Sequence, residues 1–319
     1  MIPQNIFRAY DIRGVCPDEL NRKAAEFIGK GFGTYLIRNL KINQPKVVVG
    51  CDARQSSPEL HTNFLRGLTS TGCQVTDIGL APTPLLYFAN TVGGFDAGCN
   101  ITASHNPAQY NGFKLIAREG HAVYGEQIQE IYRIIERGDF ELRGGSSPST
   151  QNDTGYFGKY LEKLKSMFSG TRSLKVVVDT GNGVAGGFYP MALEALGHKV
   201  IGLYTELDGT FPNHEPDPIV EKILTALKAK VLETGADLGL AFDGDGDRLG
   251  LVTEKGEFVP ADRLLMSLTQ DVLSRHSGGT VVYTVSNSQV LFDLAKQWGG
   301  KPVMCKVGHS YVEAAMHEH

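Results

Sequence analysis

The chain has 319 residues, of which 41% are hydrophobic and 21% are charged, and its net charge is −4. This length allows two or three domains of roughly 100 to 150 residues, each with a buried core, in a protein of ordinary globular composition. The small, evenly spread charge gives no reason to expect nucleic acid or an anionic membrane as partner, so a small anionic substrate would need a local basic pocket.

Cysteine usage and the N-terminal residues predict the compartment. The five cysteines are widely separated and form no Cys-x-x-Cys pair, which indicates free thiols in a reducing environment. The first residues do not form a basic-then-apolar leader, and no apolar run approaches the roughly 18 residues that a membrane-spanning helix needs. We therefore expect a cytoplasmic protein without a membrane partner.

The first predicted elements form a strand-helix-strand unit. Residues 46–52 are rich in valine and predict a buried parallel strand, residues 57–68 have helical composition, and residues 73–78 predict a second strand. Connections of this kind place the loops that follow parallel strands on one side of the sheet.

A loop with a serine at its tip follows the strand-like residues 95–101. Pro107 cannot continue a strand, and the small residues beside Ser104 leave room for a bulky group. His105 and Lys114 are candidate donors to such a group. Alone, this pattern is more often a capped turn, and a serine next to a histidine does not make a hydrolase triad.

Small and polar residues at 143–150 predict a linker, with a first domain boundary near residue 149. A second strand-helix-strand unit then follows, with strands at 175–181 and 198–204 around a helical stretch at 187–196.

The segment Gly181–Gly186 has the Gly-x-Gly-x-x-Gly spacing of a dinucleotide-binding turn, and Glu206 follows at a suitable distance. This spacing supports an alternative function, a nucleotide-dependent oxidoreductase. We favour a tight, closely packed turn instead, because Asp179 and Thr180 separate the strand from the glycines.

The predicted strands 238–242 and 249–253 flank an acidic loop. Asp243, Asp245 and Asp247 alternate with glycines, so three carboxylates can converge while the backbone bends freely. Mg²⁺ prefers such oxygen ligands. An isolated Asp-Gly pair would more often be a solvated hairpin turn. A calcium EF-hand is rejected, because Arg248 stands where that loop needs glycine.

The last elements repeat the pattern, with strands at 280–286 and 302–306 around a helix at 289–297. We therefore predict consecutive α/β domains of similar topology, each with a mixed, mostly parallel sheet flanked by helices. The expected domains are residues 1–149, residues 150–254 and a partial third domain at residues 255–319.

Four segments in the same order resemble the α-D-phosphohexomutases, and within them the bacterial phosphomannomutase/phosphoglucomutase branch. They are Phe7–Gly14, the serine loop with Tyr110–Lys114, Phe211–Pro218, and the acidic loop through Arg248. The first segment distinguishes this branch from the phosphoglucosamine mutases, which remain a weaker alternative.

The resemblance implies a Mg²⁺-dependent mutase that interconverts hexose 1-phosphates and 6-phosphates of mannose or glucose. It implies a phosphoserine at Ser104, a hexose 1,6-bisphosphate as intermediate and activator, and one Mg²⁺ held by the serine phosphate and the three aspartates. The remaining implied roles are proton transfer or phosphate contact for Lys114 and His309, a grip on the serine phosphate for Arg248, and contacts to the sugar phosphate for Tyr10, Arg13, His105, Arg263 and His309.

The resemblance also implies that the chain lacks the family's sugar-specificity loop, the end of its third domain and its whole fourth domain. A catalytically weak fragment that binds phosphosugars is therefore an alternative to a full mutase. The sequence does not choose between glucose and mannose.

Overall fold

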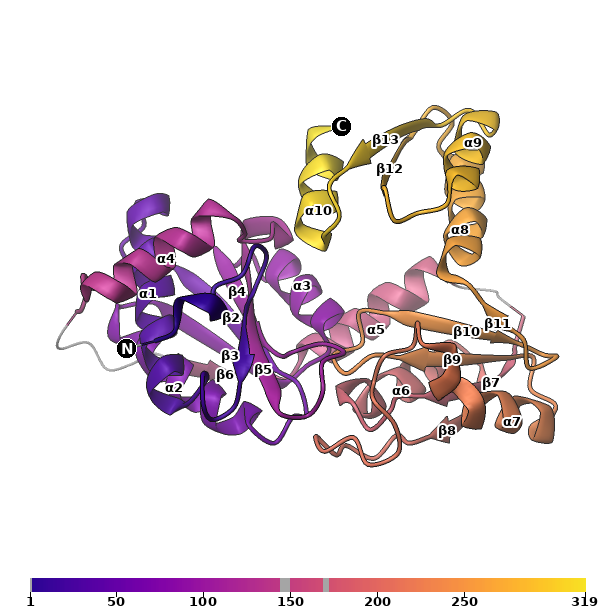
Figure 1. Cartoon of the computed structure of the whole chain (residues 1–319), viewed down its shortest axis with the longest axis horizontal. Coiled ribbons are helices and arrows are strands. Elements are labelled where there is room, and N and C mark those ends of the chain that lie inside the picture. The colour runs from indigo at the N-terminus through magenta and orange to yellow at the C-terminus, as the bar shows by residue number, and fades with distance from the viewer. Residues whose placement is uncertain (1, 144–149, 169–171) are drawn as a thin grey trace.

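The computed structural model of the chain describes residues 2–143, 150–168 and 172–319. Three α/β units follow one another along the chain (Figure 1), which confirms the predicted class of consecutive units with mixed sheets flanked by helices. The predicted linker falls mostly on residues 144–149, which lie outside the described residues. None of the described helices combines the length and the hydropathy needed to cross a membrane.

The first unit is built on a six-stranded sheet in the order β1-β5-β4-β2-β3-β6. The pairs β2–β3, β2–β4 and β3–β6 are parallel, whereas β5 runs antiparallel to β1 and β4. The strands are β1 (Ile12–Val15), β2 (Lys46–Cys51), β3 (Gln74–Leu80), β4 (Ala97–Ile101), β5 (Tyr110–Ala117) and β6 (Thr150–Asn152). The helices are α1 (Arg22–Leu40), α2 (Ser57–Ser70), α3 (Thr83–Val92) and α4 (Glu126–Arg137), with the short 3-10 helices η1 (Gln4–Ile6) and η2 (Arg118–Gly120).

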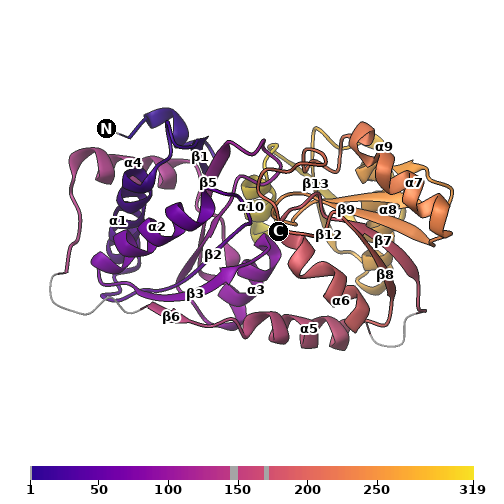
Figure 2. The same ribbon diagram turned by 90° about the horizontal axis from the view of Figure 1, so that it is seen from below.

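Strand β2 shows why this sheet is covered on both faces. Val47 and Val49 pack into the apolar core shared with α1, α2 and α4, while Val48 packs into a second core with α3 and with Tyr156. Successive side chains of a strand point to opposite faces, so an unbroken run of valines requires a layer on each side. The second layer, α3, lies toward the second unit (Figure 2).

The second unit has a five-stranded sheet in the order β11-β10-β9-β7-β8. Strand β7 pairs in parallel with β8 and β9, and β10 runs antiparallel to β9 and β11. Its strands are β7 (Lys175–Asp179), β8 (Lys199–Leu203), β9 (Leu238–Phe242), β10 (Leu249–Thr253) and β11 (Phe258–Val259). Its helices are α5 (Tyr156–Met167), α6 (Tyr189–Ala195) and α7 (Thr225–Thr234), with η3 (Val184–Gly187) and η4 (Glu221–Leu224).

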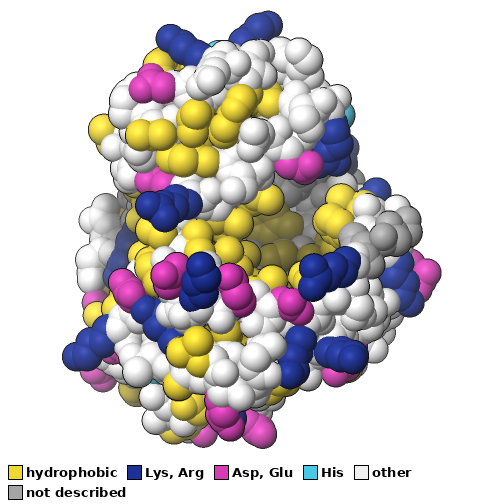
Figure 3. Space-filling model, turned by 90° about the vertical axis from the view of Figure 1, so that its right-hand side faces the viewer, with side chains coloured by type: hydrophobic (Ala, Val, Ile, Leu, Met, Phe, Trp, Pro, Cys, Tyr) yellow, Lys and Arg dark blue, Asp and Glu magenta, His cyan; other side chains and the backbone are white. Residues whose placement is uncertain are grey.

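The third unit pairs β12 (Thr280–Thr284) and β13 (Lys301–Cys305) in parallel, which confirms the last predicted strand-helix-strand repeat. Its helices are α8 (Ala261–Arg275), α9 (Gln289–Gln297) and α10 (His309–Glu318). Helix α10 reaches back to the first unit (Figure 1), where the ring of Tyr311 meets Tyr124 and that of His317 stacks on His121. Below the third unit the surface is hollowed, and hydrophobic side chains line the walls (Figure 3).

Candidate active site

Two loops from different units meet at the candidate site. The loop that follows β4 carries Ser104, and the β9–β10 hairpin carries the acidic loop, closed by the register pair Phe242–Leu249. The hydroxyl of Ser104 donates a hydrogen bond to Oδ2 of Asp243 at 2.6 Å. The two motifs that the sequence distinguishes, far apart along the chain, are therefore in direct contact.

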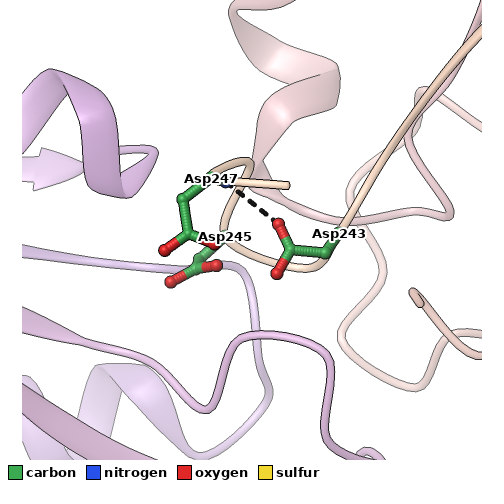
Figure 4. Close-up of side chains that lie close together, drawn as sticks. All are labelled: Asp243, Asp245 and Asp247. Carbon is green, nitrogen blue, oxygen red and sulfur yellow. Dashed lines mark hydrogen bonds between the residues drawn. The ribbon is translucent and has the colours of Figure 1, made fainter. Parts of the chain in front are cut away.

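The three carboxylates of the acidic loop gather on one side of it (Figure 4), with oxygen atoms within 4.8 Å of one another. The backbone amides of Asp247 and Arg248 both donate to Oδ1 of Asp243, at 3.0 and 3.1 Å. Gly246 has a φ of 75°, a conformation that favours glycine, and its carbonyl accepts a bond from the hydroxyl of Tyr189. The Asp-Gly alternation thus permits the turn that brings the carboxylates together.

Lys114 of β5 places its ammonium group among these carboxylates. Its Nζ lies 2.7 Å from Oδ2 of Asp245 and 2.6 Å from Oδ2 of Asp247. Burial alone would lower the pKa of Lys114, but the attraction of Asp245 and Asp247 outweighs it and raises that pKa. In this structure Lys114 is therefore a protonated ion-pair partner of the acidic loop. The family resemblance implies proton transfer or phosphate contact for this residue.

The carboxylates themselves divide into two kinds. Burial, followed by repulsion from its acidic neighbours, raises the pKa of Asp243 well above its usual range. Burial also opposes ionisation of Asp245, but the Lys114 ammonium and the hydrogen bonds to this carboxylate outweigh burial and hold its pKa below the usual range. Among the described residues nothing donates to the buried Oδ1 of Asp245. A cation at this point would satisfy that oxygen and lower the proton affinity of Asp243.

Sequence reasoning missed two residues that support the acidic loop. Thr83, at the start of α3, donates from its hydroxyl to Oδ2 of Asp245 at 2.7 Å, and its amide donates to the carbonyl of the same residue. Asn100 in turn donates to the Thr83 hydroxyl at 2.8 Å. Thr83 follows β3 just as Ser104 follows β4. Because the carboxyl ends of parallel strands lie at the same edge of a sheet, the position of Thr83 after a predicted strand is the signal that could have identified it.

Around Ser104 lies a cavity of about 410 Å³, lined by the first unit, the acidic loop of the second unit and α10. Five predicted substrate and phosphate contacts line it together with Ser104 and Lys114, namely Tyr10, Arg13, His105, Arg248 and His309. Asp11, Thr83, Tyr87 and Glu313 line it too and were not predicted. Arg263 does not: it is exposed near the start of α8. The structure therefore does not bring Arg263 to the other predicted residues.

The cationic and imidazole groups of this cavity differ in how they are held. Arg13 donates to Oδ1 of Asn106 at 2.8 Å and pairs with Asp11 at 2.6 Å, while its buried Nε has no partner among the described residues. Burial, then the neighbouring Arg248, lowers the pKa of His105. Burial, then Lys114, lowers that of His309. At neutral pH both rings are therefore neutral.

At the glycine-rich turn that resembles a dinucleotide-binding motif, the backbone of the acidic loop packs directly against Gly183. A side-chain carbon at Gly183 would lie 2.9 Å from both Cα and the carbonyl oxygen of Gly244 in the acidic loop. The second half of the Gly181–Gly186 segment forms most of η3, a four-residue 3-10 helix, so the turn does not lead directly into an α-helix that could bind a pyrophosphate. The turn packs against the acidic loop, as the structural interpretation predicts.

Comparison with known proteins agrees with this geometry. Profiles of the phosphoglucomutase/phosphomannomutase alpha/beta/alpha domains I, II and III match residues 4–142, 155–256 and 260–319. A phosphomannomutase/phosphoglucomutase of Pseudomonas aeruginosa strain PAO1 is 45% identical over 317 residues, which are 99% of this chain and 67% of that protein. The chain belongs to the phosphoglucomutase/phosphomannomutase family.

Other members of the family are similar over the same span. The phosphomannomutase/phosphoglucomutase of Pseudomonas syringae is 46% identical over 99% of this chain and 66% of its own length. A crystal structure of a family protein from Burkholderia thailandensis superposes with a TM-score of 0.94 at 42% identity, covering 100% of this chain and 69% of that one. The chain thus spans about two thirds of the length of these family members.

Proposed function

We propose that this chain is the phosphoryl-transfer core of a hexose phosphate mutase that interconverts 1- and 6-phosphates of glucose, mannose or both. One observation carries the proposal: the Ser104 hydroxyl lies 2.6 Å from an aspartate of a three-carboxylate cluster and opens onto a cavity with Arg13 and Arg248. A serine at a cation site beside basic groups is suited to holding and transferring a phosphoryl group.

The residues present fit a divalent cation. Two of the three aspartates are fully buried, and Oδ1 of Asp245 is buried without a partner among the described residues. Carboxylate oxygens are the ligands that Mg²⁺ prefers. Asp243, Asp245 and Asp247 would hold one Mg²⁺ together with an oxygen on Ser104, and the ion would neutralise charge on the transferred phosphoryl group.

The chain's own residues then divide the remaining work. When the phosphoryl group leaves Ser104, its bond to Oγ breaks and a bond to a sugar hydroxyl oxygen forms; that hydroxyl loses its proton, and Oγ takes up a proton to become a hydroxyl again. His309, neutral because burial lowers its pKa, is suited to accept this proton. Lys114 and Arg248 offer positive charge to the phosphate oxygens, and Tyr10, Arg13 and His105 line the space for the sugar.

The bisphosphate formed in this way returns its other phosphate to Ser104 after it turns around, so a hexose 1,6-bisphosphate serves as both intermediate and activator.

Five free cysteines suit a reducing compartment, and we place the protein in the cytoplasm.

The first test is phosphorylation of Ser104. After incubation with Mg²⁺ and glucose 1,6-bisphosphate, the intact mass of the chain should rise by one phosphoryl group, and Ser104→Ala should stay unlabelled. Omission of Mg²⁺ should slow labelling by at least about a hundredfold, because metal neutralisation of phosphoryl charge contributes several kcal/mol. A wild-type chain that remains unlabelled would refute the proposal.

The second test is turnover. A coupled assay on glucose 1-phosphate and mannose 1-phosphate should compare this chain with a longer family member such as the Pseudomonas protein. Labelling of Ser104 without turnover would identify a phosphoryl-transfer unit that needs further protein to complete the cycle.

A further inference from the structure

Arg54 is completely buried, although it carries the bulkiest side chain in the set of fully buried residues. It lies on the turn between β2 and α2, outside every segment that the sequence distinguishes. A buried guanidinium is rare unless its charge and its donors are satisfied. The hydrogen-bond partners of Arg54 therefore indicate its role.

All five N–H groups of Arg54 have acceptors. Nε donates to Oδ2 of Asp52 at 3.1 Å, which compensates the charge. The other four hydrogen bonds reach backbone carbonyls of the serine loop, which runs from Thr102 to Gln109, and of Tyr110, the first residue of β5. Nη1 donates to Pro107 at 2.8 Å and Tyr110 at 3.0 Å, and Nη2 donates to Ser104 at 2.8 Å and Asn106 at 2.6 Å. Arginine is the one side chain with five donors in a fixed plane, so no other residue can make this set of bonds.

The loop that Arg54 grips has a strained residue at its centre. Ser104 has a φ of 53°, in the left-handed region where a residue with a side chain is disfavoured by about 1 kcal/mol or more. Its carbonyl accepts a bond from Arg54, and its amide donates to the Thr102 hydroxyl at 2.9 Å. This backbone conformation directs the hydroxyl of Ser104 toward Asp243.

The second unit closes over Arg54 from the opposite side. The ring of Phe211 lies 5.0 Å from the guanidinium carbon. A side-chain carbon at Gly209 would lie 2.5 Å from the Ala53 carbonyl and from Cα of Arg54, so the chain can pass this closely only as glycine. Arg54 thus contacts the serine loop of the first unit and the segment at Gly209–Phe211 of the second unit.

We propose that Arg54 is a positioning residue for phosphoryl transfer at Ser104. It fixes three carbonyls of the serine loop and the carbonyl of Tyr110 that follows it, and thereby keeps the hydroxyl of Ser104 aimed at the acidic loop. The inference rests on the proposed function for its effect on transfer, but its effect on the loop is independent of that function. If Arg54 only stabilised the fold of the first unit, its replacement would lower stability without loosening this loop selectively.

The experiment compares Arg54→Lys with Arg66→Lys. The control makes the same chemical change in α2, at a side chain that is 62% exposed. Lysine keeps the charge beside Asp52 but offers one nitrogen instead of a planar fan of donors. Amide hydrogen exchange at Asn106 and Tyr110, whose amides donate within the serine loop, should accelerate by at least about tenfold in Arg54→Lys, while amides of β2 keep wild-type rates.

Transfer from glucose 1,6-bisphosphate to Ser104 should slow by about a hundredfold in Arg54→Lys, since displacement of a reacting group by about 1 Å has an effect of this size. Arg66→Lys should match wild type. If Arg54→Lys does not fold, the charge-balanced pair Asp52→Asn with Arg54→Gln leaves no unpaired buried charge and should show the same two changes.

Transfer within threefold of wild type, or exchange that rises equally in the loop and in β2, would overturn the proposal. A wild-type chain that never becomes phosphorylated would refute the proposed function, and the exchange data alone would then decide whether Arg54 holds the loop.

Discussion

At the scale of single residues, Lys114 compensates the charge of the acidic loop. Replacement by methionine should leave Asp245 buried and unpaired, so without divalent cations the free energy of unfolding should fall by about 3 kcal/mol in urea denaturation. Added Mg²⁺ should restore more stability to Lys114→Met than to wild type, because it supplies the missing positive charge. The exposed Lys163→Met should change stability by less than about 0.5 kcal/mol. Equal effects of the two substitutions would contradict this assignment.

His214 makes a second residue-scale prediction, about pH. Its Nε2 lies 3.1 Å from both oxygens of buried Asp179, and its Nδ1 lies 2.9 Å from the carbonyl of Glu215. Both nitrogens face acceptors, so the protonated ring fits best. Burial lowers the pKa of His214, but the bonds to Asp179 and Glu215 prevail and raise it.

Because the folded pKa of His214 lies above the unfolded value, its stabilising contribution is complete below about pH 6.5 and is lost as pH rises through the folded pKa. Urea denaturation between about pH 6 and pH 9 should show this loss in wild type and not in His214→Gln. At the acid end the variant should be less stable by about 1 to 2 kcal/mol. His276→Gln, at an exposed ring, should follow the wild-type pH curve; a wild-type curve parallel to that of His214→Gln would refute the linkage.

At the scale of elements, the glycine-rich turn at Gly181–Gly186 packs against the acidic loop. Gly183→Ala should lower the free energy of unfolding by about 1 to 3 kcal/mol and weaken Mg²⁺ binding, because its new carbon meets the Gly244 backbone at 2.9 Å. Calorimetric titration with Mg²⁺ measures the second effect. Gly187→Ala is the matched control, since its nearest neighbour would be a Leu207 methyl at 3.8 Å. Equal Mg²⁺ affinity in both variants would show that the turn does not support the loop.

At the scale of the whole molecule, sequence patterns predicted what depends on local chemistry. Runs of valine predicted the buried strands, and the alternation of aspartate and glycine predicted the converging carboxylates. Thr83 and Arg54 could not be found from local patterns, because their importance comes from partners that are distant in sequence and lie partly in the second unit. Arg263, whose role the resemblance implies, is exposed near the start of α8 and does not line the cavity, and a motif match does not fix where α8 begins in space. The roles of the predicted site residues remain predictions.

Because α10 contacts the first unit, the two sides of the cavity are synthesised at different times. Synthesis proceeds from the N-terminus at roughly 5 to 20 residues per second. The serine loop, Arg54 and the acidic loop all precede β10, whereas His309 and Glu313, which line the cavity, follow about 60 residues later in the chain. The carboxylates of the proposed cation site are therefore synthesised some seconds before these two residues. The order of synthesis thus allows the proposed cation site to form before the cavity beside it is walled.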